Sequence, residues 1–200
     1  TVIYPPVEIK HFTPSTRIDD YFIAGGRLVP YKRIDMIIHV FNRLGYRLKI
    51  FGIGSEYNYL KSIAGPTIEF LGRISDQEKA ELLSHAKAFI HPQLEDAGVT
   101  PLEAMASGRP VIAFGQGGAA ETVIHGETGI LFPTQSWESL LDAVIHFDEK
   151  QWDSNRIREH AEYFDIERFK HAVAHLVHNR YEEFRRNLEQ PRLLFAGATL

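Results

Sequence analysis

Two carboxylates, Glu95 and Glu103, flank the loop run Glu95-Asp96-Ala97-Gly98-Val99-Thr100-Pro101-Leu102-Glu103. Carboxylate oxygens accept hydrogen bonds, so they suit the hydroxyl groups of a sugar. Thr100, Pro101 and Glu103 have the types and spacing of a helix start, with a cap, a first-turn proline and a capping-box acid. The free backbone N–H groups of a helix start can bind a phosphate. Together these features suggest a pocket for a nucleotide sugar.

The same residues also have a simpler interpretation. A capping box accounts for Thr100 and Glu103 without any ligand, and Glu95 and Asp96 can be solvated loop acids. A third interpretation is a hydrolase in which Glu95 and Glu103 form an acid/base pair, which would depend on the separation of the two carboxylates. The carboxylate pair alone leaves these alternatives open.

A second candidate site is the basic, glycine-rich run Gly25-Gly26-Arg27-Leu28-Val29-Pro30-Tyr31-Lys32-Arg33. Arg27 can offer a planar fork of donors to phosphate oxygens, Lys32 offers a mobile charge, and the glycines allow close approach of the backbone. The run is neither a Walker A motif nor the dinucleotide fingerprint. If Lys32 and Arg33 only belonged to the first turn of a helix, their positive charges would lie at the helix end that already carries a partial positive charge. This misplacement favours an anion site.

Three further glycine runs follow predicted strands. Gly52-Ile53-Gly54 resembles part of a dinucleotide motif, but Tyr57 stands where a third glycine is needed. Gly72-Arg73-Ile74 could present backbone groups to a base, with a plain strand-to-helix turn as the alternative. Gly117-Gly118 either opens another helix near the same cleft or forms a flexible turn.

The elements that would position these residues alternate along the chain. Strands are predicted at 21–25, 46–51, 67–71, 87–91, 110–114 and 129–132. Helices are predicted at 34–44, 56–64, 76–85, 101–107 and 137–147, with a capping box at Ser75-x-x-Glu78. This alternation predicts an α/β fold, a Rossmann-like doubly wound parallel sheet with helices on both faces. In such sheets the ligand lies beyond the carboxyl ends of the strands, where all the candidate loops fall.

The chain is expected to consist of three segments. Residues 1–20 are expected to form an extended lead-in segment, and residues 21–188 a nucleotide-sugar-binding domain that closes with a long amphipathic helix from Ile166. Residues 189–200 are expected to form a tail. The chain starts without methionine and with the proline pair Pro5-Pro6, so we expect it to be part of a longer protein.

Composition excludes several classes of protein. The 200 residues, 44% of them hydrophobic, are enough for a globular domain with a sizeable core. A net charge of −4 argues against a nucleic-acid partner. The absence of cysteine excludes disulfides and thiolate chemistry, and the ten histidines show no metal-ligand spacing, so no metal is expected. The sequence has no apolar run of membrane-spanning length and no signal segment, and we expect a cytoplasmic location.

Several motifs in fixed order carry a resemblance to a known family. They are Gly26-Arg27-Leu28-Val29-Pro30-x-Lys32, Glu95-x7-Glu103, the run from Pro101 to Ala113, and Gly117-Gly118-x-x-Glu121-Thr122-Val123. From Tyr4-Pro5-Pro6-Val7 to about residue 185, the chain resembles the C-terminal half of a retaining glycosyltransferase of family 4. Such enzymes have the two-domain GT-B fold, and this half holds the nucleotide-sugar donor.

The resemblance implies a role for each matching residue. Arg27, Lys32 and Glu95 would be the catalytic residues: the two cations hold the donor diphosphate and stabilise charge on the departing nucleotide without a metal or other cofactor, and Glu95 contacts hydroxyls of the sugar. The implied donor-binding residues are Gly26 in the first loop, Gly72, Arg73 and Ile74 against the base, Ala97, Gly98 and Val99 beside the sugar, Thr100 facing phosphate, and Glu103 on the ribose hydroxyls.

The loop at Glu95 and the run that starts at Gly108 indicate which nucleotide sugar is the donor. The family often has a bulky aromatic where Ala97 stands, but here Glu95-Asp96-Ala97-Gly98 and the run from Gly108 to Gly115 are similar to the branch that transfers mannose from GDP-mannose. The implied partners are this donor, a glycan or lipid-linked acceptor bound by an N-terminal half of the same chain, and, for the parent chain, the inner face of the membrane. The isolated domain is expected to be inactive in transfer. The alternative is a non-catalytic nucleotide- or protein-binding module, which the missing aromatic supports.

Overall fold

A computed structural model describes residues 1–189 of the chain. Its centre is a sheet of six strands in the order β3-β2-β1-β4-β5-β6, in which every neighbouring pair is parallel. The predicted Rossmann-like doubly wound sheet is therefore confirmed, with all six predicted strands present. The strands are β1 (Phe22–Gly25), β2 (Leu48–Phe51), β3 (Ile68–Gly72), β4 (Phe89–His91), β5 (Val111–Phe114) and β6 (Gly129–Phe132).

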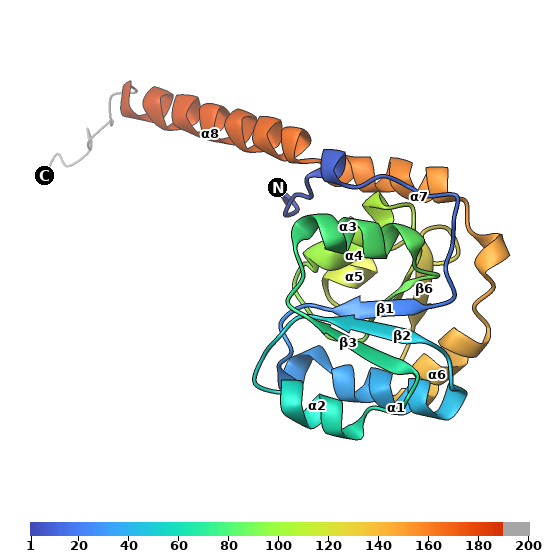
Figure 1. Ribbon diagram of the computed structural model, residues 1–200. Helices are drawn as coiled ribbons and strands as arrows, with labels where there is room; N and C mark the ends of the chain where they lie inside the picture. Colours follow the sequence, from blue (N-terminus) through green and yellow to red (C-terminus); the bar gives the residue numbers. More distant parts are fainter. Residues whose placement is uncertain (190–200) are drawn as a thin grey trace, which may run out of the picture.

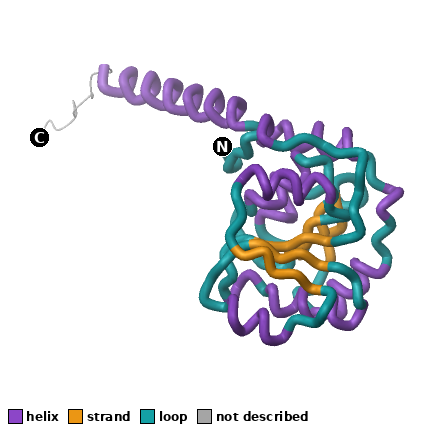
Figure 2. The backbone as a smooth tube through the Cα atoms, viewed as in Figure 1, coloured by secondary structure: helices purple, strands orange, loops and turns teal. Residues whose placement is uncertain are grey.

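Helices cover both faces of the sheet, which forms the middle of three layers in Figures 1 and 2. One face carries α1 (Ile34–Leu44), α2 (Tyr57–Ile63) and α6 (Trp137–Ile145). The other face carries α3 (Asp76–His85), α4 (Val99–Ala106) and α5 (Gly118–Thr122), and α7 (Ser154–Ala161) packs against α4. Short 3-10 helices lie at Ile9–His11, Pro30–Lys32, Glu149–Gln151 and Glu162–Phe164.

Two hydrophobic clusters fill the spaces between the layers, and successive strand residues alternate between them. Ile23 and Phe89 belong to the cluster beneath α3, α4 and α5, whereas Phe22 and Ile90 belong to the cluster beneath α1, α2 and α6. All four side chains are at most 4% exposed. Burying a large apolar side chain stabilises the fold by about 1.5–3 kcal/mol, so both faces of the sheet fix its position.

The starts of α3 and α4 give opposite outcomes for the two predicted capping boxes. Ser75 caps α3 as predicted: its hydroxyl accepts from the Glu78 backbone N–H, and the Glu78 carboxylate accepts from the Ser75 N–H at 2.8 Å. At α4 the prediction is wrong, because the helix begins at Val99 and its cap is Gly98, with φ at 80° and no side-chain bond. Thr100 therefore lies inside the first turn, and the Glu103 side chain is taken by a partner on another helix.

The lead-in segment packs into the domain. Val7, Ile9 and Phe12 are buried within the cluster that contains α4 and α7. Arg158 on α7 donates to the backbone oxygens of Ile9, Phe12 and Ala106, so it ties this segment to the end of α4. A buried arginine, Arg109, likewise donates to backbone oxygens of Ser15, Arg17 and Ser84.

The lead-in segment also meets the start of the last helix. The Val7 N–H donates to the Phe164 oxygen at 2.9 Å, and the Val7 oxygen accepts from the Ile166 N–H at 3.1 Å. The two stretches form a short parallel bridge between Val7 and Asp165. The incoming chain and the start of α8 therefore lie side by side.

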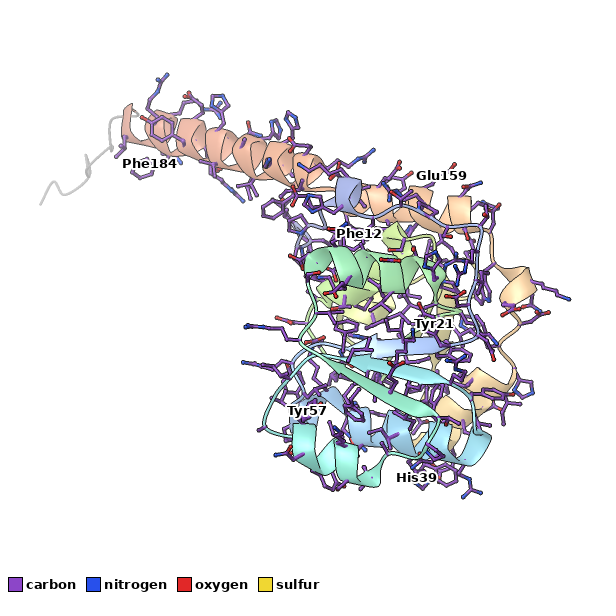
Figure 3. The ribbon with its side chains drawn as sticks, viewed as in Figure 1. Phe12, Tyr21, His39, Tyr57, Glu159 and Phe184 are labelled. Carbon is purple, nitrogen blue, oxygen red and sulfur yellow. The ribbon has the colours of Figure 1, made fainter. Side chains whose placement is uncertain are left out.

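Helix α8 (Ile166–Glu189) extends away from the body of the domain (Figure 1). Its amphipathic pattern was predicted, but four large apolar residues on it are exposed, namely Val177, Tyr181, Phe184 and Leu188. Figure 3 shows Phe184 near the far end of this helix. Of the predicted tail, only Glu189 is described, as the last residue of α8; residues 190–200 lie outside the described residues. Within residues 1–189, no helix has the length and apolar character needed to cross a membrane.

Candidate functional site

The candidate site lies where the order of the strands reverses, between β1 and β4. After β3 the chain returns to the middle of the sheet and places β4 on the other side of β1. The loops that follow β1 and β4 therefore start from adjacent strands and lead away from each other. A crevice at the carboxyl ends of strands, at such a reversal, is the general ligand position of open α/β sheets. The two candidate runs identified in the sequence are the loops that follow β1 and β4, at this reversal.

Glu95 joins these two loops. Its carboxylate forms an ion pair with Lys32, and the two side chains are only 19% and 14% exposed. It also accepts hydrogen bonds from Gln93 at 3.2 Å and from the Tyr31 hydroxyl at 3.4 Å. Burial opposes ionisation of Glu95, but the hydrogen bonds from Lys32 and Gln93 outweigh it and hold the pKa of this carboxyl below its usual range. Glu95 is therefore a carboxylate at neutral pH.

The local backbone explains how Lys32 reaches Glu95. The 3-10 helix Pro30–Lys32 begins with proline and ends at Arg33, which has a left-handed conformation with φ at 52°. Arg33 separates this short helix from α1 and places Lys32 before the helix proper rather than in its first turn. The unfavourable position of a cation at a helix start, noted in the sequence, is thus compensated by Glu95.

His91, the last residue of β4, lies next to the Glu95 carboxylate. It is 1% exposed, and its Nε2 lies 3.7 Å from a carboxylate oxygen of Glu95. Burial lowers the pKa of His91 to about 4, against an opposing effect of Glu95, so the imidazole is neutral at pH 7. Its Nδ1 has no hydrogen-bond partner among the described residues. The sequence analysis missed His91, and the available signal was its position at the carboxyl end of a predicted strand.

The double glycine Gly117-Gly118 packs directly against the Glu95 loop. The Gly118 N–H donates to the Glu95 backbone oxygen at 2.8 Å. A Cβ on Gly117 would lie 2.2 Å from that oxygen, and one on Gly118 would lie 2.5 Å from the Asp96 oxygen. Of the two interpretations given above, the helix start is confirmed, since α5 begins at Gly118. These glycines are required because backbone meets backbone at this point.

The loop after β1 is shaped by a similar contact. Gly26 has φ at 124°, and a Cβ on Gly52 would overlap its oxygen at 1.8 Å. A Cβ on Gly54 would likewise lie only 2.1 Å from the backbone oxygen of Leu28. The Gly52-Ile53-Gly54 run therefore supports the Arg27 loop. Arg27 is exposed, and within residues 1–189 its side chain makes no ion pair or hydrogen bond.

Glu103 has a separate cationic partner. Lys79 on α3 donates to its carboxylate at 2.8 Å and also pairs with Asp76 at 3.2 Å. Burial raises the pKa of Glu103 even though Lys79 opposes this, because the carboxyl is only 13% exposed. The pKa of Lys79 is also raised: burial would lower it, but the two acids outweigh that effect. Lys79 was missed in the sequence, since its spacing to Glu103 matches no local motif.

The remaining predicted donor-binding residues flank this centre. Gly72, with φ at 67°, ends β3, and its oxygen accepts from the Gly52 N–H at 2.6 Å. Arg73 is exposed, while Ile74 is half-buried against the core. The others lie at the start of α4 or just before it: Ala97, Gly98 and Thr100 are half-buried, and Val99 is 41% exposed. The structure thus joins Lys32 to Glu95 directly, and the donor-binding roles stay predictions.

The described residues also bear on a metal site. Residues 1–189 contain no group of three or more histidine, aspartate or glutamate side chains placed to hold a metal ion. Each of Glu95 and Glu103 has its own lysine partner. Such an arrangement can bind an anion through its cations and hydroxyl groups through its carboxylates.

Comparisons with known proteins identify relatives over most of the chain. A family model described as "Glycosyl transferases group 1" matches residues 9–164. A GDP-mannose-dependent alpha-mannosyltransferase of Mycobacterium tuberculosis is 35% identical over 153 residues, covering 70% of this chain and 40% of that protein. The alpha-1,3/1,6-mannosyltransferase ALG2 of Dictyostelium discoideum is 46% identical over 63 residues, covering 31% of this chain and 15% of that protein.

Solved structures show the same fold. The sucrose-phosphate synthase of Thermosynechococcus elongatus matches with a TM-score of 0.81 and 23% identity, over 92% of this chain and 53% of that one. Anabaena HepE in complex with UDP and glucose matches with a TM-score of 0.76 and 21% identity, over 88% of this chain and 56% of that one. The chain spans about half of these structures and 40% of the mycobacterial relative.

Proposed function

The chain belongs to the family of group 1 glycosyl transferases, and on this premise we propose that it is the donor-binding half of a retaining hexosyltransferase. In this proposal the site between β1 and β4 binds a nucleotide sugar and releases the nucleotide without a metal or other cofactor. The acceptor, a glycan or a lipid-linked molecule, binds to an N-terminal half of the same protein. The parent protein acts in the cytoplasm, at the inner face of the membrane if it associates with lipid.

The observation that carries the proposal is the ion pair of Lys32 and Glu95, which joins the loops that follow β1 and β4. It places a mobile cation and an ionised carboxylate together at the ligand position of the fold. A diphosphate can take Lys32 from Glu95, because the lysine side chain is flexible and phosphate oxygens attract it strongly. Glu95, which remains ionised, is then free to accept hydrogen bonds from sugar hydroxyls. Arg27, which has no ion-pair partner within residues 1–189, supplies a second cation from the same loop.

These groups support a reaction driven by electrostatics. When the bond between the anomeric carbon and the donor phosphate breaks, negative charge grows on the departing diphosphate. Arg27 and Lys32 stabilise that charge in the transition state more than in the bound donor. Glu95 holds the sugar in place and its negative charge favours the positive character that develops on the sugar ring. The hydrolase alternative is not favoured, since the family of the chain transfers glycosyl groups.

We propose that the donor is GDP-mannose. Relatives named as GDP-mannose-dependent mannosyltransferases occur in Mycobacterium tuberculosis and Mycolicibacterium smegmatis, at 35% and 32% identity. The Glu95-Asp96-Ala97-Gly98 loop agrees with that branch. The alternative function is a non-catalytic module that binds a nucleotide or a protein, which the absence of an aromatic at Ala97 favours.

Calorimetric binding of GDP, UDP, ADP and GDP-mannose to the 200-residue chain tests the proposal. We expect GDP and GDP-mannose to bind in preference to the other two. Replacing Arg27 or Lys32 by alanine should weaken GDP binding at least tenfold, the loss of about 1.5–3 kcal/mol expected for one hydrogen bond to a charged group. Arg47→Ala is the matched control, because Arg47 is exposed and precedes β2 at the opposite edge of the sheet.

The outcomes separate the alternatives. Equal binding of all four ligands, or an equal loss in the Arg47→Ala variant, would contradict a specific donor site. No binding by a chain that circular dichroism shows to be folded would support the protein-binding module. Binding of GDP with no mannose transfer, even when the full-length protein and an acceptor are supplied, would leave a nucleotide-binding module.

A further inference from the structure

The Glu103 carboxylate lies in a position that is difficult for an ion. It is 13% exposed and lines a cavity of about 490 Å³ between the lead-in segment, α3 and the start of α4. We propose that Lys79 is a positioning residue, which keeps Glu103 ionised and aimed at the donor site so that it can recognise the ribose diol. This inference rests on the proposed function and assigns Lys79 a role in selecting ribonucleotides.

The geometry of α3 fixes Lys79 in place. The helix starts at a complete capping box. The Lys79 N–H donates to the Ser75 oxygen at 2.9 Å, and this hydrogen bond closes the first turn of the helix. From there the side chain crosses to α4 and reaches Glu103 at 2.8 Å. Its amine is held between two carboxylates, Glu103 at 2.8 Å and Asp76 at 3.2 Å. The amine therefore approaches Glu103 from one defined direction.

The charges around Glu103 make Lys79 its essential partner. Asp76 on α3 adds negative charge and raises the pKa of Glu103 further, after the larger effect of burial. On the lead-in segment, Glu8 and His11 line the same cavity, and a Glu8 carboxylate oxygen lies 3.3 Å from the His11 Nδ1. Among the described residues, Lys79 is the cation that contacts Glu103.

Loss of Lys79 would change the chemistry of the carboxyl group. An ionised carboxylate only accepts hydrogen bonds, so it can take two from the adjacent hydroxyls of a ribose. A protonated carboxyl offers one donor and fewer acceptors, and an uncompensated buried carboxylate takes up a proton instead of remaining charged. Lys79 thus acts through Glu103 and does not itself need to touch the ribose.

The test compares GDP with 2′,3′-dideoxy-GDP, which lacks the diol, by calorimetry on the 200-residue chain. For Lys79→Met we expect GDP affinity to fall about tenfold or more at pH 7 while dideoxy-GDP affinity stays the same. Lys79→Arg should restore GDP affinity, since it keeps the charge. The matched control is Lys170→Met on α8, which removes an ion pair with Glu167 of similar length, 2.7 Å, but at an exposed position.

Three readouts separate positioning from a structural effect. In Lys79→Met, GDP affinity should recover as the pH rises, because a higher pH ionises Glu103 again. The pKa of the Glu103 carboxyl, measured by carbon NMR without nucleotide, should be higher than in the wild type. In a Glu103→Gln background, Lys79→Met should cause no further loss of GDP affinity, since the group through which it acts is gone.

Several results would overturn the inference. These are an unchanged GDP affinity in Lys79→Met, an equal loss of GDP and dideoxy-GDP, or additive losses in the double variant, since the last two would mean that Lys79 contacts the nucleotide elsewhere or supports the fold. All of them leave the proposed function in place, because the wild type still binds GDP. If the folded wild type binds no nucleotide, the proposed function fails and this inference fails with it.

Discussion

His91 connects the candidate site with the stability of the domain. Its imidazole is 1% exposed between the core and the ion pair of Glu95 and Lys32. A histidine with a lowered pKa in the folded state binds fewer protons there than in the unfolded chain. Its effect on stability is therefore absent above pH 6.5, and stability is lost as the pH falls from 6.5 toward about 4. Acidification should thus weaken the site and the fold together.

We expect His91→Gln to flatten this pH dependence. Between pH 7 and pH 4.5, the free energy of unfolding should fall by about 2 kcal/mol less in the variant than in the wild type. The reason is that the unfolded wild type takes up a proton on His91 in this pH range, whereas glutamine cannot. Urea denaturation at the two pH values measures the difference. His146→Gln is the control, since the His146 side chain is 73% exposed, and it should behave like the wild type. Parallel pH curves for all three proteins would contradict the buried, neutral state of His91.

The chemistry of individual residues could be predicted only where it follows from a local pattern. Arg27, Lys32 and Glu95 could be selected as candidates because glycines and strand ends surround them in the sequence. The direct pairing of Lys32 with Glu95 could not, since it depends on β4 returning to the side of β1. Lys79 escaped prediction for a similar reason: its partner Glu103 lies on a different helix, and only tertiary packing brings the two together.

At the scale of elements, the α/β alternation predicts the fold well because each strand is a short apolar run between amphipathic helices. Boundaries are less certain, and the start of α4 shows the cause. A local pattern favours Thr100 as the cap, but Gly98 can adopt a positive φ and ends the loop earlier. Glu103, freed from the capping box, then pairs with Lys79. Tertiary contacts therefore overrode a valid local signal.

The contact between the α5 start and the Glu95 loop gives a prediction for this scale. Gly117→Ala should displace the Glu95 backbone, because its Cβ would lie 2.2 Å from the Glu95 oxygen, and so should weaken GDP binding. Gly126→Ala is a matched control, since Gly126 also has a positive φ, 80°, but no atom lies within 4 Å of its Cβ position. Both variants should lose about 1–3 kcal/mol of stability from backbone strain.

Calorimetry with GDP and urea denaturation distinguish the two glycine variants. Only Gly117→Ala should lose affinity for GDP. If Gly126→Ala loses affinity to the same extent, general backbone strain explains the effect, and the α5 start has no special part in shaping the site.

At the scale of the whole molecule, α8 is packed against the core only near its start, and its outer half extends away from the body of the domain. Phe164, before this helix, is 9% exposed within the core, whereas Phe184 on its outer half is 60% exposed (Figure 3). We expect Phe164→Ala to lower the free energy of unfolding by about 3–5 kcal/mol, as a cavity in a core does. Phe184→Ala should change it by no more than about 0.5 kcal/mol, as at an exposed surface position.

Urea denaturation of both phenylalanine variants provides the measurement, at two protein concentrations to detect self-association. A large loss for Phe184→Ala would mean that the outer half of α8 packs against something in solution. A small loss for Phe164→Ala would mean that the base of α8 is not part of the cooperative core.

The bridge between Val7 and Asp165 has a consequence for modularity. Because the chain enters and leaves the folded body through two hydrogen-bonded neighbours, the span between them is a closed loop of polypeptide with adjacent ends. A unit of this kind can be grafted into a surface turn of a host protein with little strain on the host, or circularly permuted by linking its ends. Chimaeras that exchange this span between related proteins should therefore keep Val7 and Asp165 together inside the exchanged span, because Val7 is buried in the core.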